Sequence, residues 1–439
     1  LQRVLPLPHD RDLSHDPRTM IQSLRKNGGS SRIENPAECE SVAGQRAYEG
    51  KNSYNWCAWG AISSRTKVRI NNVTVWVKYT AKFHLIVHTY TGNKDNDFAR
   101  EYPALKSRQF RAWFYLSNVK REGSPGAGEA TARTFPFSLG LAFKPSGCSV
   151  TPTGLNGFIY KGPEKWEEEG GAYTFTSDLA QSSGPDKVGY CKLQPQLHMP
   201  EQVLDPYDYL AHENPVFRCD SSPKITSSKG GCVVWKDSRP AFELSRSAQV
   251  LLPNGTLITN PVKESADHIW DAWSRPGATV PLDPQKVIPG FDMRNPLERN
   301  TDTSRKGLGG KNRRAAIKQC DRSYSDPRPR PPGVRYTKKL KDAAGNVIAR
   351  SCDEFPFAAT HQGASKAGTN YSVRAILDDD NCTAGSWLGW WFERNRVLEK
   401  QKFTVTVLNT QDPGLNGSYP PPVESCTPDE VLVPDSEAP

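Results

Sequence analysis

The chain has 439 residues, 36% of them hydrophobic, with 36 Pro, 34 Gly and a formal net charge of +9. This length is too great for one ordinary core and fits two or three domains, and the Pro and Gly content predicts more strand and irregular structure than helix. The sequence lacks an apolar run of about 18 residues, which excludes a membrane-spanning helix from the prediction.

The positive charge is concentrated in residues 294–350, which hold sixteen Lys and Arg against five Asp and Glu, while the rest of the chain is slightly acidic. This asymmetry is typical of a surface that binds a polyanion, most simply nucleic acid. A solvated basic linker would have the same composition. Charge alone therefore leaves a nucleic-acid site and a linker as alternatives.

Ten cysteines occur without any CxxC or CxxH spacing, and several come as local pairs. Zinc sites usually bring two thiolates within two to four residues of each other, so disulfides and an oxidising location are the preferred interpretation. Without an initiator Met or a signal peptide, we expect a secreted, extracellular protein in its processed form. The local pairs are Cys39–Cys57, Cys148–Cys191 and Cys219–Cys232.

The first half of the chain favours strands. Residues 1–35 are polar and aperiodic, so we expect an N-terminal extension. Within 66–90, apolar side chains alternate in two successive groups, Val73 to Val77 and Phe83 to Val87, which predicts two long strands. Further strands are predicted at 110–119, 133–143, 172–179 and 230–237. Many strands between Gly, Pro and Ser turns favour a mainly β, antiparallel, sandwich-like domain over 36–262.

The pattern changes near residue 263. "KESADHIWDAWSRP" places Ile269, Trp270 and Trp273 at helical spacing and ends at a proline. The segment that follows is basic and has little periodicity, so 263–314 is interpreted as a helix followed by an irregular connector.

The last part of the chain predicts an α+β domain over 315–410, followed by a Pro-rich, acidic tail at 411–439. Strands at 333–341 and 346–352, joined by the turn signal "DAAG", place Asp353 at a strand end. Another strand is expected at 371–377 and a last one at 402–409. Between them, Asp380 or Asn381 can cap a helix whose buried stripe holds Trp387, Leu388, Trp391 and Phe392.

Acidic and amide side chains gather at two of these junctions. Asp353, Glu354, Asp380 and Asn381 offer the oxygen ligands that one Mg²⁺ or Mn²⁺ prefers. Such an ion could support phosphodiester hydrolysis, and a helix N-terminus also attracts phosphate. Taken singly, each group is more simply a turn or a helix cap.

The combination of motifs resembles a known family. "CDEFPFAATHQGA", "YSVRAI", "DDNCTAGSWLG" and a last strand with "FTVTV" are similar, in this order, to the NucA/NucB-type secreted deoxyribonucleases. The matching positions are Asp353, Glu354, Phe355, Pro356, Gly363, Asp380, Asn381, Gly385, Ser386, Trp387 and Gly389. The resemblance covers about residues 315–410, and it implies a ββα-metal-like nuclease core that holds one divalent ion and cuts DNA.

The resemblance also implies residue roles. Asp353 would be the general base, Asn381 a metal ligand, Glu354 a ligand or an orienting group, and Asp380 a further ligand. His361 is an alternative base or a polar loop residue. Trp390 and Trp391 stand where a polar residue could be a further metal ligand or phosphate contact, and Glu393 or Arg394 could supply that contact instead. The expected DNA contacts are Arg313, Arg314, Lys318, Arg350, Ser386 and Arg394. Cys320, Cys352, Cys382 and Cys426 would pair among themselves and brace both catalytic segments.

The sequence therefore predicts a secreted, two-domain, metal-dependent endonuclease that hydrolyses DNA without contacting a membrane. One alternative is a β-sandwich protein that binds a cell surface or a glycan and carries an inactive DNA-binding C-terminal domain. A nuclease toxin delivered to competitors is another. Salt-sensitive DNA binding without cleavage would distinguish the first alternative.

Overall fold

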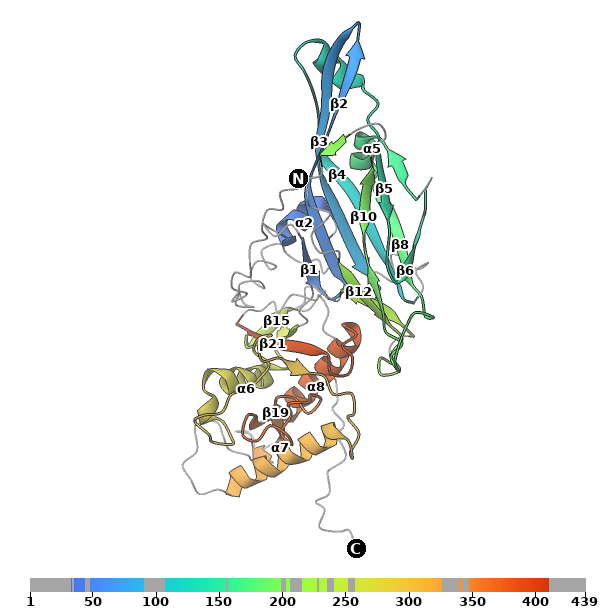
Figure 1. The fold of residues 1–439 in the computed structure, drawn as a ribbon. Helices are drawn as coiled ribbons and strands as arrows, with labels where there is room; N and C mark the ends of the chain where they lie inside the picture. Colours follow the sequence, from blue (N-terminus) through green and yellow to red (C-terminus); the bar gives the residue numbers. More distant parts are fainter. Residues whose placement is uncertain are drawn as a thin grey trace.

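The computed structural model describes residues 33, 35–43, 48–90, 107–154, 157–198, 203–205, 215–226, 229–234, 241–251, 257–325, 339–341 and 347–409. They form a β-rich unit, which comprises the described residues from 33 to 234, and a C-terminal unit, which comprises those from 241 to 409 (Figure 1). The predicted extension up to residue 32, the "DAAG" turn and the tail from 411 lie outside the described residues.

The β-rich unit is built on one large antiparallel sheet. Its long central strands are β2 (Asn55–Ile70), β3 (Val73–Thr89) and β4 (Gln109–Gly123), and its strand order is β1-β2-β3-β4-β8-β6, with β11 paired to β2. The shorter strands are β1 (Tyr48–Asn52), β6 (Cys148–Thr151), β8 (Gly171–Ser177) and β11 (Val203–Asp205).

Two three-stranded antiparallel sheets pack against one face of the large sheet. One contains β10 (Pro195–His198), β5 (Leu139–Phe143) and β7 (Ile159–Lys161), and the other contains β13 (Gly231–Val234), β12 (Val216–Asp220) and β9 (Gly189–Lys192). Apolar side chains of both layers, such as Tyr79, Leu141 and Phe217, form one core. The antiparallel β character predicted for the N-terminal part is confirmed. Three short helices flank these sheets, namely α2 (Pro36–Ala43), α4 (Ala127–Thr134) and α5 (Pro163–Glu168).

The prediction for residues 66–90 was wrong in its turn position. Both apolar groups, Val73 to Val77 and Phe83 to Val87, lie in the single strand β3, which pairs with β2 over its whole length. The chain reverses at Asn71 and Asn72, whose φ angles of 47° and 64° suit a tight hairpin turn. Asn tolerates this left-handed backbone, so "NN" was the turn signal.

The described part of the C-terminal unit combines helices with the two-stranded sheet of β15 (Gln249–Leu251) and β16 (Leu257–Thr259) and with two three-stranded sheets. In one of the three-stranded sheets, β21 (Lys402–Leu408) lies between β14 (Ala241–Ser245), which is parallel to it, and β17 (Leu297–Glu298). The other is antiparallel and contains β18 (Lys339–Lys341), β19 (Val347–Phe355) and β20 (Ser372–Leu377). The remaining elements are α6 (Lys263–Ser274), the 3-10 helix η3 (Pro276–Ala278), α7 (Leu308–Ser325) and α8 (Asp378–Arg394).

One core joins segments that the sequence assigned to three regions. Phe242 of β14, Ile269 of α6, and Trp387 and Trp391 of α8 pack together with Phe403 of β21. The boundaries expected at 262/263 and 314/315 would divide this core, because α6 packs between β14 and α8 instead of forming a connector. We propose instead that this unit begins near residue 241.

Four disulfides are formed by the described cysteines. Cys39–Cys57, Cys148–Cys191 and Cys219–Cys232 are the predicted local pairs, and Cys320–Cys352 ties α7 to β19. Cys382 is also disulfide-bonded, and Cys426 lies outside the described residues. In the described part of the chain, no helix has the length and apolar character needed to cross a membrane.

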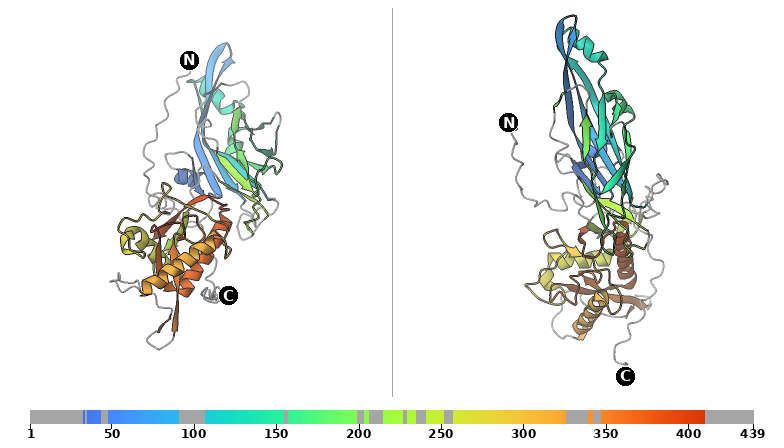
Figure 2. Two further views of the ribbon diagram at one scale, coloured as in Figure 1. Left: turned by 60° about the horizontal axis from the view of Figure 1, so that its bottom comes forward. Right: turned by 45° about the vertical axis from the view of Figure 1, so that its right-hand side comes forward.

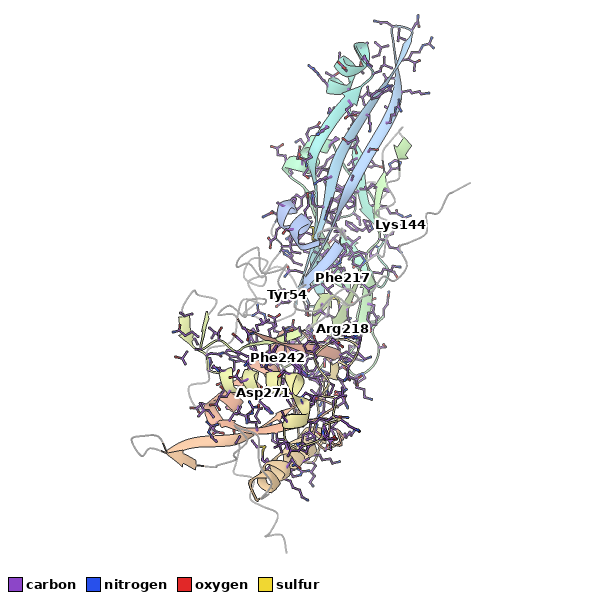
Figure 3. The ribbon with its side chains drawn as sticks, turned by 90° about the vertical axis from the view of Figure 1, so that its left-hand side faces the viewer. Tyr54, Lys144, Phe217, Arg218, Phe242 and Asp271 are labelled. Carbon is purple, nitrogen blue, oxygen red and sulfur yellow. A yellow bond between two sulfur atoms is a disulfide. The ribbon has the colours of Figure 1, made fainter. Side chains whose placement is uncertain are left out.

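A buried ion cluster connects the two units. Arg396, which follows α8, donates from Nη2 and Nε to the two carboxylate oxygens of Asp220 on β12, at 2.5 and 3.0 Å. Arg218 donates to the carbonyl oxygen of Arg396 and, at 2.5 Å, to Oε1 of Gln401. All three charged residues are at most 1% exposed, and Figure 3 places Arg218 and Tyr54 at the end of the β-rich unit nearest the C-terminal unit.

We expect this cluster to control the stability of the whole protein. Asp220→Ala would leave two buried guanidinium groups without their carboxylate, and breaking a buried ion pair in this way costs about 3–5 kcal/mol. Urea unfolding followed by tryptophan fluorescence would measure the loss. The control Glu168→Ala removes an exposed carboxylate from α5 and should leave the midpoint unchanged. Equal midpoints for both variants would contradict this role.

Candidate active site

The side chains of Asp353 and Glu354 leave opposite faces of β19. Successive side chains of a strand alternate between its two faces. Cys352 faces α7, where it is bonded to Cys320, and Glu354 lies two residues further along on the same face. Asp353 faces α6 instead. The structure therefore does not bring the two carboxylates together in the way that the motif suggested.

On the α6 face, Asp353 belongs to a buried hydrogen-bonded chain. Its Oδ2 lies 2.7 Å from Nδ1 of His268, and Nε2 of His268 lies 2.8 Å from Oγ of Ser372. Strand pairing places Ser372 opposite Phe355 and Arg374 opposite Asp353, so β19 and β20 present these groups side by side. Both His268 and Ser372 are fully buried.

This chain has the order of a Ser-His-Asp triad, but its burial excludes that use. A nucleophilic serine must reach substrate, and the Ser372 side chain is inaccessible to solvent. Of the three residues, Asp353 alone has some exposure, at 11% of its side chain. The chain therefore holds Asp353 in place instead of activating Ser372.

Burial determines the protonation of Asp353 and His268 in this hydrogen-bonded chain. It raises the pKa of Asp353 to about 7, against an opposing effect of Arg374, and it lowers the pKa of His268 well below its usual value. His268 is therefore neutral, with a proton on either Nδ1 or Nε2. Ser372 can donate to Nε2 or accept from it, so the chain stays satisfied whether Asp353 is ionised or protonated.

Glu354 lies among groups of α7 and the following loop. Burial first, and then the nearby charge of Asp353, raise its pKa to about 8, while Arg313 of α7 lowers it. Arg313 and Lys318 are exposed, and Arg314 donates to the carbonyl oxygen of Arg305. Helix α7 lies on the side of the C-terminal unit away from the β-rich unit (Figure 2). The expected DNA contacts of α7 therefore share a surface with Glu354.

Asn381, in the first turn of α8, is beside Asp353. Its Nδ2 donates to Oγ of Ser351, at 2.9 Å, and to the carbonyl oxygen of Cys352, at 3.2 Å. Ser351 shares the α6 face with Asp353. One turn further, Ser386 is exposed beside Gly385, and a Cβ added at Gly385 would meet no atom within 4 Å. The surface of α8 next to Asn381 is thus open to close approach.

Asp380 caps α6, which differs from its expected roles as a ligand or as the cap of its own helix. Its Oδ2 and Oδ1 accept the backbone N–H groups of Glu264 and Ser265, at 2.7 and 2.9 Å. Val262, which precedes α6, provides no side-chain cap, so the first N–H groups need an acceptor from elsewhere. Burial raises the pKa of Asp380 to about 6, and these N–H groups oppose the shift.

Two expected DNA contacts are engaged with protein groups. Arg350 forms an ion pair with Glu264 of α6, at 3.1 Å, and donates to the carbonyl oxygen of Ala375. Arg394 is 4% exposed, and its guanidinium lies over the rings of Trp390 and Tyr54. Arg394 therefore packs at the junction of the two units and does not face solvent.

The secondary candidates also lie away from Asp353. Nε2 of His361 lies 2.6 Å from Oε1 of Glu399 in a loop pair. Oε1 of Glu393 accepts hydrogen bonds from the N–H and the hydroxyl of Thr226 in the β-rich unit. In the structure His361 is therefore engaged with Glu399, and Glu393 lies at the junction of the two units.

Among the described residues, no group of three or more His, Cys, Asp and Glu side chains could hold a metal ion. The donors next to Asp353 still suit a hard cation that keeps several waters, because such an ion needs only one or two protein oxygens besides those of a phosphate. Asn381 fits this need, since its two described hydrogen bonds use Nδ2 and leave Oδ1 as a ligand. Glu354 and Asp380 fit it less well.

Sequence reasoning missed His268 and Ser372. The sequence predicts His268 only as part of the helix in the connector, more than eighty residues before Asp353. Its one signal was a histidine on the apolar stripe of "ADHIWDAW", next to Ile269. A buried histidine on such a stripe requires polar partners, but the sequence alone does not name them.

Comparison with family models gives one match in this part of the chain. Residues 298–406 match the family described as Deoxyribonuclease NucA/NucB. The match confirms the family expected from the motifs for the C-terminal region. It includes α7, β19, β20 and α8, and it begins after β14 and α6, which precede residue 298. Comparisons with curated proteins and with solved structures give no match.

The raised pKa of Asp353 predicts a pH-dependent stability. Asp353 binds its proton more tightly in the folded chain, at a pKa of about 7, than in the unfolded chain, at about 3.9. Its contribution to stability is therefore lost as the pH rises from about 4 to 7. Asp353→Asn removes this penalty, so its melting temperature relative to wild type should be higher at pH 8 than at pH 5, in the presence of a chelator.

The matched control is Asp379→Asn, which removes an exposed carboxylate from the first turn of α8. Its melting temperature relative to wild type should change little between the two pH values. A difference for Asp353→Asn that is the same at pH 5 and pH 8 would show that burial does not penalise the Asp353 carboxylate.

Proposed function

We propose that the C-terminal unit is a metal-dependent endonuclease that hydrolyses phosphodiester bonds of DNA, with Asp353 as the general base. The family match supports deoxyribonuclease activity as the class. The observation that carries the assignment of the base is the Asp353 carboxylate, held by His268 at a strand end beside Asn381, with a pKa near 7. A base is most effective when its pKa lies near the working pH.

Each residue of the proposed site has its own role. His268 donates from Nδ1 to Oδ2 of Asp353 and fixes the carboxylate, so Oδ1 receives the proton of the attacking water. Oδ1 of Asn381 would hold the divalent ion, which when bound supplies positive charge for the phosphate and the leaving oxygen. Arg313 and Lys318 on α7 attract the DNA backbone.

Secretion forms part of this proposal. Four disulfides among the described residues are suited to an oxidising compartment, where such bonds form and persist. Extracellular DNA would then be the substrate. The need for a metal follows from the nucleophile, because bulk water is a much weaker acid than a protonated base with a pKa near 7, and a bound divalent ion lowers the pKa of water.

Plasmid cleavage in the presence of Mg²⁺ or Mn²⁺ tests the proposal. Loss of a general base typically costs 10²- to 10⁴-fold in rate, so we expect a loss of about that size for Asp353→Ala. A chelator should abolish cleavage by the wild-type protein, and added Mn²⁺ or Mg²⁺ should restore it. The readout is the conversion of supercoiled plasmid to nicked and linear forms on a gel.

Asp379→Asn again serves as the control, because it changes the charge of an exposed carboxylate in the same unit. It should cut at close to the wild-type rate. Wild-type activity in Asp353→Ala would exclude Asp353 as the base. DNA binding by a wild-type protein that never cleaves would favour an inactive DNA-binding domain instead.

His268 is a positioning residue, and its variants should separate positioning from folding. His268→Asn keeps an N–H donor near the place of Nδ1, whereas His268→Leu removes both ring nitrogens and leaves Asp353 and Ser372 without a buried partner, at a cost of about 1–3 kcal/mol. We expect kcat to fall about tenfold or more in His268→Leu, with KM little changed, and to recover partly in His268→Asn.

Ser372→Ala provides the matched test of the triad-like order. Since Ser372 acts only through His268, its loss should reduce kcat modestly, much less than the loss of Asp353. Equal kcat values for His268→Asn and His268→Leu, at equal folded fractions measured by circular dichroism, would contradict a positioning role.

A further inference from the structure

The β-rich unit carries a row of cations on one face of its large sheet. Arg65, Lys67 and Arg69 alternate along β2 and therefore point to the same face. Strand pairing sets Lys78 of β3 opposite Arg65, and Lys120 of β4 opposite Thr80, which lies two residues from Lys78. These five residues form one surface, called the basic ladder from here on.

The basic ladder is exposed, and within the described part of the chain its cations form no ion pair with a carboxylate. Four of its side chains are exposed and Lys78 is partly exposed. None of the five is in an ion pair with a described residue, and Glu122, opposite Lys78, is the one acidic side chain that the pairing of β2, β3 and β4 places among them. The other face of these strands is buried in the core of the β-rich unit.

The same face of the sheet is covered at the other end of β2 and β3, near Cys57 and Lys82. There, α2 covers it, with Cys39 bonded to Cys57 and Glu40 paired to both Lys82 and His84. Lys82, the cation next to α2, is thus neutralised by a carboxylate of a packed helix. Beyond Lys82 no described element covers the face, and the cations are left for an external anion.

An aromatic ring completes the surface. Trp76 lies opposite Lys67 in the strand pairing and is partly exposed. The guanidinium of Arg65 lies 4.7 Å from the centre of its ring. Cations interleaved with an aromatic ring are the combination that nucleic-acid surfaces use, because phosphates attract the cations and bases or sugars pack on the ring.

We propose that the basic ladder binds the phosphate backbone of DNA, as a second contact for the polymer that the C-terminal unit cuts. The choice of DNA as the polyanion rests on the proposed function, whereas the positive charge of the surface is an independent observation. Neighbouring cations of the ladder along β2 are about 6.8 Å apart, and a DNA duplex carries a charge about every 1.7 Å of its axis. Each cation of the ladder can therefore contact a phosphate.

The surface chemistry favours a polyanion over a lipid surface. Helices and strands that bind membranes pair their cations with several large apolar groups that enter the lipid. Near the turn, Val68, Ile70 and Val73 are exposed or partly exposed, but alternation places them on the other face of the sheet. Among the described residues of the tip, Trp76 is the large apolar side chain that is partly exposed on the face of the cations. Binding through charge to an elongated polyanion is therefore the better match.

The position of the ladder sets a length requirement on the substrate. The β2–β3 hairpin points away from the C-terminal unit (Figure 1). Its strand β3 has 17 residues and therefore spans about 56 Å, the length of about 16 base pairs. Long DNA can contact both units at once, whereas a duplex of about 10 base pairs cannot.

Binding of a fluorescent 40-base-pair duplex to the full chain, in a chelator that prevents cleavage, tests the proposal. In the triple variant Arg65→Ser/Lys67→Ser/Arg69→Ser, the Kd at low salt should rise about tenfold or more. The slope of log Kd against log salt should fall by about two to three, since each lost phosphate contact removes about 0.9.

The matched control removes three cations elsewhere on the β-rich unit, in Lys144→Ser/Lys165→Ser/Lys192→Ser. Lys165 is in α5, Lys192 ends β9 and Lys144 follows β5, and all three are exposed. The control should keep the wild-type Kd and slope. Equal losses in both triple variants would reduce the effect to net charge and overturn the ladder, as would no loss in either.

Two further measurements separate this proposal from the proposed function. With Mg²⁺ present, the ladder variant should show a higher KM on plasmid and an unchanged rate on a 10-base-pair duplex. If the wild-type protein does not cleave DNA, yet loses binding in the ladder variant, the nuclease assignment fails and the ladder stands. Binding of the wild-type protein to vesicles of anionic phosphatidylglycerol, with loss in the ladder variant and without DNA binding, would overturn the ladder as a DNA contact.

Discussion

Side-chain alternation in β19 is the constraint on which the site depends. Because the period of a strand is two, the acidic pair cannot act from one side: Asp353 turns to α6 and Glu354 turns to α7. The α6 face is buried and supplies a neutral histidine, and the α7 face is lined by arginine and lysine. The proposed mechanism therefore gives the two carboxylates different roles: Asp353 is the proposed base, and Glu354 lies near the cations that are the proposed DNA contacts.

The chemistry of the α6 face depends on residues outside the family match. His268 belongs to α6, which precedes residues 298–406, and α6 itself is capped by Asp380 from α8. The two contacts are therefore reciprocal: α8 supplies the carboxylate that accepts the first N–H groups of α6, and α6 supplies the histidine that is hydrogen-bonded to Asp353. A segment cut at the limits of the family match would lose one partner of each contact.

The two units are joined by charges that have no access to water. Asp220 lies between Arg218 and Arg396, and burial lowers the pKa of Arg218 to about 10 although Asp220 opposes the shift. Such a cluster fixes a geometry, since each member is costly to bury without its partners. A fixed junction suits the proposed DNA contact, because it would keep the basic ladder and the proposed site at one separation while a single DNA molecule contacts both.

The sequence by itself determined the local features: the β character of the first half, β20, β21, the helix from Asp378, three disulfide pairs and the family of the C-terminal region. These depend on periodicity and on short motifs, which are encoded within a few residues. The partners of Asp353, the cap of α6, and the burial of Arg394 were decided by tertiary structure alone. They join residues such as His268 and Asp353, which are 85 positions apart, and a local pattern carries no record of a partner at that distance.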